Sequence, residues 1–219
     1  EEIYFDLDKT EQGTENLIDL AKKYAEKNDI SKAEDIFELI FEKDPENLNA
    51  YLGLADLFRD REGYELDAAQ NYREAALLNV RLGNFKEAQK LLNKALKIIP
   101  EHPPIQREIV NLYLDVENRD EERAKKELKK LIKIFHKVGQ DEKAFSAWNE
   151  LIALDPQDAD SHRAMVSEYL DKGRDRDAIE SLIQLGQVYR SKENYEEALS
   201  ICDECEKIDS NDVASKSFR

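Results

Sequence analysis

A fixed spacing recurs four times along this 219-residue chain, and it constrains the fold more than any other sequence feature. An aromatic or polar residue is followed nine residues later by alanine, and twelve residues after that by proline or a substitute. The four sets are Tyr24–Ala33–Pro45, Asn79–Ala88–Pro100, Phe135–Ala144–Pro156 and Tyr189–Ala198–Ser210. Such a recurrence indicates an array of one repeated helical unit, whose core is buried between neighbouring units.

Each segment before the proline carries small or apolar residues three to five positions apart, which places them on one face of a helix. The residues are Ala33, Phe37 and Ile40; Ala88, Leu92 and Ala95; Ala144, Trp148 and Leu151; and Ala198, Cys202 and Cys205. Asn28, Gly83 and Gly139 stand five positions before an alanine of this set. Asparagine and glycine adopt the left-handed conformation most easily, so we expect a helix to end at each of them.

The alanine that follows each turn returns at a nearly constant interval, from Ala33 to Ala88, Ala144 and Ala198. A second alanine, at Ala68, Ala124 or Ala178, lies inside each interval. We therefore expect the helices around residues 66–82, 121–138 and 176–192 to serve twice, closing one repeat and opening the next. The pattern predicts an all-α solenoid of about eleven antiparallel helices.

Residues 14–47, which contain Ala21, Ala33 and Pro45, resemble the tetratricopeptide repeat family. Units of that family have about 34 residues, with small residues at the eighth and twentieth positions and proline near the thirty-second. The resemblance implies a helical-repeat fold that binds proteins or peptides. The interval between the alanines, roughly 55 residues, marks a divergent array with three helices per unit. One uniform concave groove should not be assumed for such an array.

We divide the chain into an extended N-terminal segment, a solenoid and a short end. The segment covers residues 1–13, the solenoid covers residues 14–210, and the start of a further helix or tail covers residues 211–219. The units of the solenoid are residues 14–47, 48–100, 101–156 and 157–210. The chain begins with Glu1 rather than methionine, so we expect it to be a fragment of a longer protein.

The composition excludes several classes of function. A formal net charge of −16 argues against nucleic-acid binding, which normally requires a basic face. No apolar run approaches the roughly 20 residues of a membrane-spanning helix, so we expect no direct membrane insertion. Two cysteines are too few for a disulfide scaffold and favour a reducing compartment, which suggests a cytoplasmic location.

The segment from Arg123 to Lys137 is basic within this acidic chain, with seven lysines and arginines and one acidic residue, Glu127. Its lysines form a polar stripe opposite an apolar one. The predicted partner-binding lysines are Lys126, Lys129, Lys130, Lys133 and Lys137. They could bind an acidic peptide or a terminal carboxylate through charge-assisted hydrogen bonds. The alternative is a solvated face balanced by acidic residues of neighbouring helices.

Arg107 and Asn111 are two further candidates for partner binding. Tetratricopeptide repeats that hold a C-terminal carboxylate use lysine, asparagine and arginine at defined positions of successive units. Arg107 and Asn111 match the first pair of such a clamp in type and spacing, with arginine in place of lysine. The corresponding residues Ile18 and Lys22 depart from the clamp pattern, so the resemblance implies the binding of an anionic peptide and nothing more specific.

Other candidate sites favour structural roles. Cys202 and Cys205 form a CxxC motif, but both occupy packing positions, and a zinc site would need two further ligands; we expect buried thiols. His162 occupies the helix position of Tyr51 and Gln106, so we expect it either to pack between helices or to face a groove. We find no catalytic triad, phosphate loop or spaced metal ligands. The sequence therefore predicts no catalytic residues, no metal and no cofactor.

We expect a non-enzymatic scaffold or adaptor that binds partner proteins or peptides and supports the assembly of a larger complex. Two alternatives remain open: an RNA-processing helical-repeat protein, and a regulatory domain of a larger enzyme. Residues 1–13 alternate acidic residues with Ile3, Tyr4, Phe5 and Leu7. This segment is a candidate for self-association by docking on the lysines at 126–137, or else a linker or cover for the first repeat.

Overall fold

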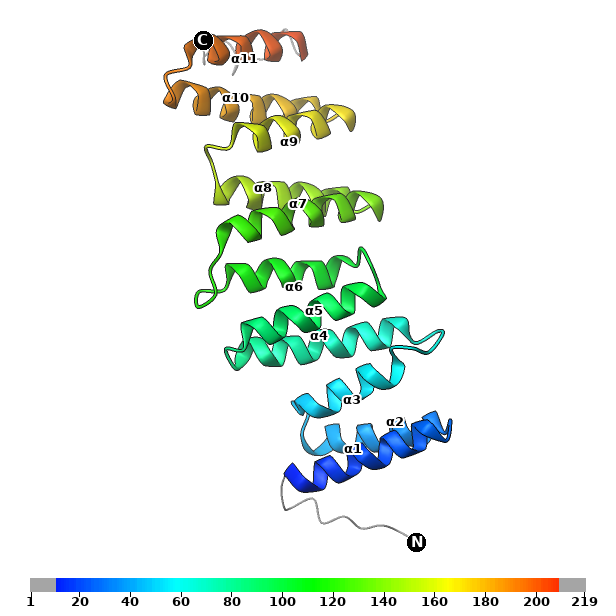
Figure 1. The fold of residues 1–219 in the computed structure, drawn as a ribbon. Helices are drawn as coiled ribbons and strands as arrows, with labels where there is room; N and C mark the ends of the chain where they lie inside the picture. Colours follow the sequence, from blue (N-terminus) through cyan, green and yellow to red (C-terminus); the bar gives the residue numbers. More distant parts are fainter. Residues whose placement is uncertain (1–10, 209–219) are drawn as a thin grey trace. The chain divides into compact units, whose positions relative to one another are not determined.

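The computed structural model describes residues 11–208, and this range contains eleven α-helices and no strand (Figure 1). The helices are α1 (Glu11–Glu26), α2 (Ile30–Lys43), α3 (Leu48–Phe58), α4 (Glu65–Arg81), α5 (Phe85–Ile98), α6 (Pro103–Leu114), α7 (Glu121–Lys137), α8 (Asp141–Leu154), α9 (Ala159–Asp171), α10 (Asp175–Ser191) and α11 (Tyr195–Ile208). The predicted fold class and number of helices are therefore confirmed. The segment 211–219 lies outside the described residues, as does the segment 1–13 apart from its last residues, where α1 begins.

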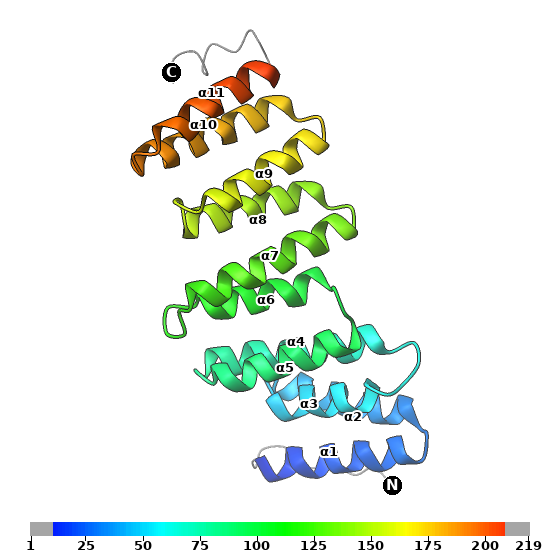
Figure 2. The same cartoon turned by 45° about the horizontal axis from the view of Figure 1, so that its top comes forward.

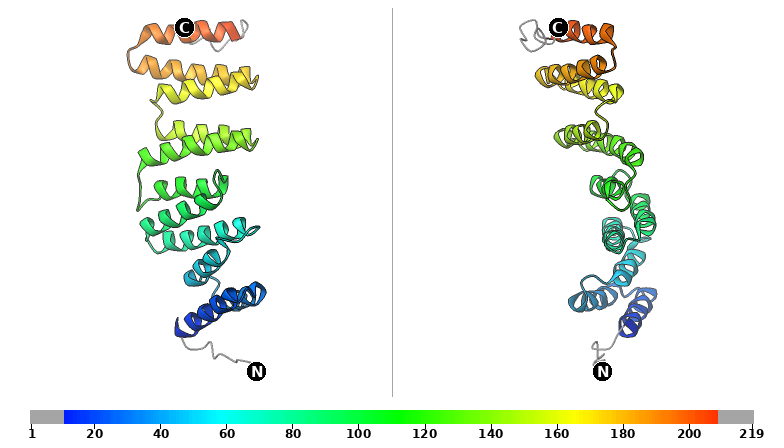
Figure 3. Two further views of the ribbon diagram at one scale, coloured as in Figure 1. Left: turned by 45° about the vertical axis from the view of Figure 1, so that its right-hand side comes forward. Right: turned by 90° about the vertical axis from the view of Figure 1, so that its left-hand side faces the viewer.

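The chain forms two compact units, residues 1–124 and residues 125–219, and the boundary falls in the first turn of α7. In the first unit, α1 packs against α2 and α3, while α4 packs against both α3 and α5 (Figure 2). In the second unit, α10 packs against both α9 and α11, and consecutive helices run in opposite directions (Figure 3). Thus α4 and α10 each contact both of their neighbours in sequence.

Alanines occupy the tightest places between the helices. The alanines that define the spacing, Ala33, Ala88 and Ala144, have no exposed surface, and the same holds for the second set, Ala68, Ala124 and Ala178. A methyl side chain lets two helix backbones approach closely, while larger residues such as Phe37 and Leu92 fill the space beside it. The periodic alanines of the sequence thus mark the positions at which helices pack closely.

Six of the turns between helices share a left-handed residue five positions before an alanine. Asn28, Gly83 and Gly139 have the predicted left-handed conformation, with φ of 61°, 73° and 72°. Gly63, Gly173 and Glu193 adopt it as well, again five residues before a buried or nearly buried alanine. The next residue then donates its backbone N–H to a carbonyl near the helix end, as Asn84 does to Asn79 at 2.8 Å. This bond satisfies a carbonyl that the helix leaves without a partner.

The residues after each proline are also equivalent between repeats. The Tyr51 hydroxyl donates to the Pro45 carbonyl at 3.1 Å, and His162 Nε2 lies 3.2 Å from the Pro156 carbonyl. Both interactions tie the start of a helix to the end of the one before it. His162 is only 2% exposed, so the packing role predicted for this histidine is confirmed.

Candidate functional site

The predicted lysines lie on the exposed side of α7. The opposite side of the helix is buried through Leu128, Leu131, Ile132 and Phe135, which directs the lysine stripe to solvent. We call the five exposed lysines of α7 the lysine face: Lys126, Lys129, Lys130, Lys133 and Lys137.

Acidic groups partly neutralise the lysine face. Lys130 pairs with Glu127 of its own helix at 2.8 Å, and Lys129 lies 3.8 Å from Asp158 at the start of α9. Within residues 11–208, Lys126 and Lys133 have no ion-pair partner. The alternative of a balanced, solvated face therefore describes part of this surface, while two lysines remain available to a partner.

Arg107 and Asn111 lie on α6, in the first unit, whereas the lysine face belongs to the second. The Asn111 side chain donates to Glu108 at 3.2 Å, and the same carboxylate group accepts from Arg73 at 2.5 Å. The Asn111 amide is thus partly engaged within its own helix. Arg107 and Asn111 are therefore a candidate binding site distinct from the lysine face.

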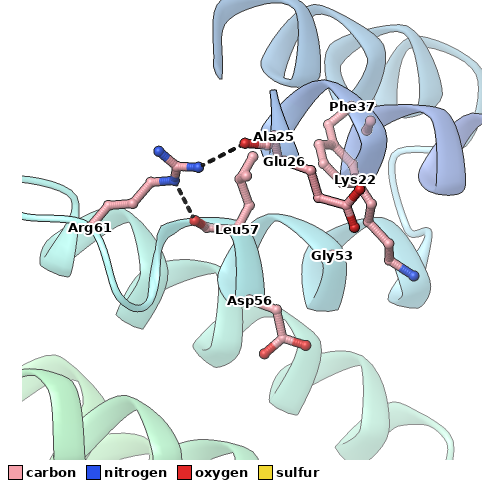
Figure 4. Close-up of a pocket in the computed structure, with 9 residues that line it drawn as sticks. Lys22, Ala25, Glu26, Phe37, Gly53, Asp56, Leu57 and Arg61 are labelled. Carbon is pink, nitrogen blue, oxygen red and sulfur yellow. Dashed lines mark hydrogen bonds between the residues drawn. The ribbon is translucent and has the colours of Figure 1, made fainter. Parts of the chain in front are cut away.

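A hollow between α1, α2 and α3 is a feature that the sequence reasoning missed. It has a volume of about 400 Å³, and its apolar lining comes from small and aliphatic residues of α1 and α3 and from Phe37 of α2 (Figure 4). Gly53 lets the Phe37 ring pack closely against α3, because a Cβ atom there would lie 2.7 Å from Phe37 Cε1. We call this space the α1–α3 hollow; a volume of this size is in the usual range for ligand sites. It is lined by Ala21, Lys22, Ala25, Glu26, Phe37, Gly53, Asp56, Leu57 and Arg61.

Charged side chains surround the hollow. Arg61 closes one end, where Nε donates to the Leu57 carbonyl at 2.9 Å and Nη2 to the Ala25 carbonyl at 3.4 Å (Figure 4). A second hollow of about 350 Å³ shares Lys22, Gly53 and Asp56 with the first. The two hollows therefore adjoin at these residues, and we call them together the groove along α1 and α3. The second is lined by Glu15, Ile18, Asp19, Lys22, Asn49, Leu52, Gly53 and Asp56.

Asp56 is fixed in the groove by a buried tyrosine from α4. The Tyr72 hydroxyl donates to Asp56, and Arg59 donates to the same carboxylate oxygen at 3.3 Å. Burial, together with the hydrogen bond to Asp56, raises the pKa of Tyr72 to about 12. The phenol stays protonated at neutral pH and holds the carboxylate in place.

The groove and the lysine face occupy the same positions of the repeat. Ala33 is equivalent to Ala144, and Pro45 to Pro156, and the same shift relates all of α1 to α3 to α7 to α9 without insertion. We call this correspondence the repeat register. In this register, five groove-lining residues of α1 correspond to the lysine face. The pairs are Glu15 with Lys126, Ile18 with Lys129, Asp19 with Lys130, Lys22 with Lys133, and Glu26 with Lys137.

The α1–α3 hollow itself corresponds to a polar cluster in the second unit. Positions Ala25, Leu57 and Arg61 become His136, Glu168 and Lys172. His136 Nδ1 lies 2.7 Å from Asp141, and its Nε2 lies 2.7 Å from Glu168. These side chains, with Trp148, form the polar cluster that joins α7, α8 and α9.

Two further hydrogen bonds complete the polar cluster. Trp148 Nε1 donates to Glu168 at 2.6 Å, and Lys172 Nζ donates to Asp141 at 2.7 Å. The hydrogen bond from Lys172, followed by that from His136, lowers the pKa of Asp141. Where the first unit has a space, the second has a set of paired polar groups.

The remaining candidates behave as structural elements. Cys202 and Cys205 are 2% and 1% exposed and unbonded to each other, as expected for thiols at packing positions. Residues 11–208 contain no group of histidine, cysteine and acidic side chains that could hold a metal ion. No helix in this range is both long and apolar enough to cross a membrane. The N-terminal segment predicted to self-associate lies outside the described residues.

Two segments of the chain, residues 69–102 and 179–212, match the sequence profile of the tetratricopeptide repeat. They include the α4–α5 and α10–α11 helix pairs and the spacings around Ala88 and Ala198. No curated protein matches the chain in sequence. The resemblance carried by the spacing is confirmed for these two segments: both match the tetratricopeptide repeat, a unit that generally serves as a module for protein–protein interaction.

Several solved structures are similar over most of the chain, at low identity. A tetratricopeptide repeat protein from Parabacteroides merdae is 20% identical, over 94% of this chain and 97% of its own, with a TM-score of 0.26. A putative kinesin light chain from Podosopora anserina with TPR-like repeats is 16% identical, over 89% and 93%, with a TM-score of 0.44. YrrB, described as a TPR protein with an unusual peptide-binding site, is 17% identical, over 83% and 96%, with a TM-score of 0.28.

Proposed function

We propose that the chain is a non-enzymatic scaffold or adaptor that binds segments of partner proteins and supports the assembly of a larger complex. The observation that carries this proposal is the groove along α1 and α3, which contains an apolar hollow of about 400 Å³ lined in part by Gly53. A partner side chain placed there would bury apolar surface at roughly 25 cal/mol per Å². Small residues on both helices provide the depth.

The lysine face is proposed as a second partner-binding surface, for an acidic segment. Lys126 and Lys133 support it because both are exposed and have no ion-pair partner within residues 11–208. Unpaired lysines attract a carboxylate without first breaking an internal ion pair. Lys129 and Lys130 would have to exchange Asp158 and Glu127 for the partner, so their contribution should be smaller. Lys137 extends this surface by one turn.

Arg107 and Asn111 remain a separate proposal for the first unit. Their spacing of one helical turn supports contact with one anionic group. An RNA ligand is less well supported, because the net charge is −16 and the segment from Arg123 to Lys137 is a local basic stretch within an acidic chain.

Pairs of charge-reversed variants of the intact chain test the proposal. Partners crosslinked in native extract would be compared between the unaltered chain, K126E/K133E, and the control K86E/K97E, which reverses two exposed lysines of α5. We expect the first variant to lose a subset of partners that the control retains, with unchanged helicity. Identical partners for all three proteins would reject the lysine face, and the absence of any specific partner would reject the scaffold. Loss of capture on ribonuclease treatment would favour the RNA alternative.

A further inference from the structure

We infer that the groove along α1 and α3 selects a partner segment with an apolar anchor flanked by basic residues, the opposite charge preference to that of the lysine face. This inference rests on the proposed function and specifies the ligand of one of its surfaces. It follows from the side chains that α1 and α3 place along the groove.

Carboxylates outnumber cations in the lining of the two hollows. The acidic residues are Glu15, Asp19, Glu26 and Asp56, and the basic residues are Lys22 and Arg61. Lys22 lies 3.5 Å from Asp19, and Arg61 directs its N–H groups to backbone carbonyls. The basic side chains are therefore partly engaged, and so are Asp19 with Lys22 and Asp56 with Arg59. The net charge of the lining favours a cationic ligand.

Two of the carboxylates are free to pair with such a ligand. Within residues 11–208, neither Glu15 nor Glu26 has an ion-pair partner, and both are exposed. They are eleven residues apart on α1, which is three helical turns, so they lie on the same face and about 16 Å apart along the axis. Each marks one end of the groove.

The apolar part of the groove lies between these ends. Gly53, Ala21 and Ala25 leave space for a side chain above Phe37 and beside Leu57. An extended chain covers about 16 Å in about five residues. The geometry thus fits a short extended segment with a basic residue near each end and one apolar side chain between them.

The repeat itself supplies the contrast in charge. Glu15 and Glu26 correspond to Lys126 and Lys137, and Asp19 corresponds to Lys130. A segment that suits α1 would place its basic residues against lysines on α7. Because juxtaposed like charges are unfavourable, the two helices would reject each other's ligands. One repeated position therefore provides two interaction surfaces of opposite charge preference.

Matched synthetic peptides test the inference on the intact chain. Each has a central leucine in a serine and glycine background, and a residue near each end is lysine, glutamate or serine. Chemical shifts of the Gly53 amide would report binding to the groove. At low salt we expect the lysine peptide to shift Gly53 and to bind about tenfold more tightly than the glutamate peptide. Serine should give an intermediate affinity.

Two charge-neutralising variants localise the effect. E15Q/E26Q should weaken the lysine peptide about three- to tenfold, because each exposed charge pair contributes modestly. K126Q/K133Q is the matched control and should leave Gly53-reported binding unchanged. Neither variant alters a buried residue, so both should retain the helical circular dichroism of the unaltered chain.

Several outcomes would overturn the inference. Equal affinity for the lysine and glutamate peptides, no shift of Gly53, or no effect of E15Q/E26Q would each reject the charge preference. If E15Q/E26Q abolished self-association of the chain in sedimentation, the occupant would be a second copy rather than a partner segment. The proposed function would survive any of these results if K126E/K133E still lost specific partners, and the two failures are therefore distinguishable.

Discussion

The same position of the repeat is a hollow in the first unit and a polar cluster in the second. In the first unit, Ala25 and Leu57 leave space above Phe37. In the second, the equivalent His136 and Glu168 are bonded at 2.7 Å, beside Trp148. The helix framework is common to both. The comparison shows that a few side chains determine whether this position of the repeat is an open hollow or a hydrogen-bonded cluster between helices.

The two solutions have different energetic consequences. An apolar hollow leaves surface uncovered that a ligand can bury. A hydrogen-bonded cluster is satisfied within the protein, and removing one member leaves the others without partners, which is costly in a partly buried site. We therefore expect mutations in the second unit to affect stability, and those in the first to affect binding.

The largest effect is expected from breaking the polar cluster. E168A should lower the free energy of unfolding of the second unit by about 2–3 kcal/mol, because Trp148 Nε1 and His136 Nε2 lose their common acceptor. Urea unfolding followed by the fluorescence of Trp148, the one tryptophan of the chain, measures this directly. E168Q keeps one acceptor oxygen and should cost less. A loss below about 0.5 kcal/mol for E168A would show that the polar cluster contributes little to the stability of the second unit.

A smaller effect on stability is expected from exchanging two small residues at equivalent positions of the two units, Gly53 in α3 and Ala164 in α9. Alanine normally stabilises a helix by about 1 kcal/mol relative to glycine. G53A should instead destabilise the first unit by about 1 kcal/mol, because the new Cβ would meet Phe37 at 2.7 Å.

The matched change in the second unit is A164G, which should cost about 1 kcal/mol through helix propensity alone. Hydrogen exchange would measure each unit separately. Stabilisation by G53A would contradict the close contact with Phe37.

The smallest effect is expected in the dependence of stability on pH. Lys172 and His136 lower the pKa of Asp141 below its ordinary value of 3.8. The folded state therefore binds this proton more weakly than the unfolded state does. The resulting stabilisation is fully present above the ordinary pKa and is lost as the pH falls through the lower, folded value.

The measurement is the urea midpoint of the second unit, from Trp148 fluorescence, between about pH 5 and about pH 3. D141N should have a lower midpoint at the upper end of this range and should converge with the unaltered chain at the lower end. Parallel curves for the two proteins would show that Asp141 does not titrate in this way.

The fold could be predicted from sequence because its determinants are local and periodic. Ala33 and its equivalents mark helix contacts, and Asn28 or Gly83 mark turns, whatever the partner helix contains. Glu193 was not identified as a turn residue, since glutamate has no intrinsic preference for a left-handed conformation. There the conformation is imposed by the repeat, with φ of 59°.

The sites were less predictable because they depend on pairs of residues that are distant in sequence. The lysine face was identified by composition, but its neutralisation by Asp158 depends on the packing of α9 against the preceding helices. The α1–α3 hollow is lined by residues of separate helices, among them Gly53 and Phe37, and neither residue is unusual alone. The one signal in the sequence was the repeat register, which places acidic residues in α1 where α7 has lysines.

The left-handed Glu193 has a consequence for the order in which the helices open. A non-glycine residue in this conformation costs roughly 1 kcal/mol or more, a cost that Gly83 avoids at the equivalent turn. The α10–α11 hairpin therefore closes less favourably than the α4–α5 hairpin, other contacts being equal. A difference of about 1 kcal/mol corresponds to about fivefold more frequent local opening. Backbone amides of α11 should thus exchange with solvent before those of α5, and glycine at position 193 should reduce the gap.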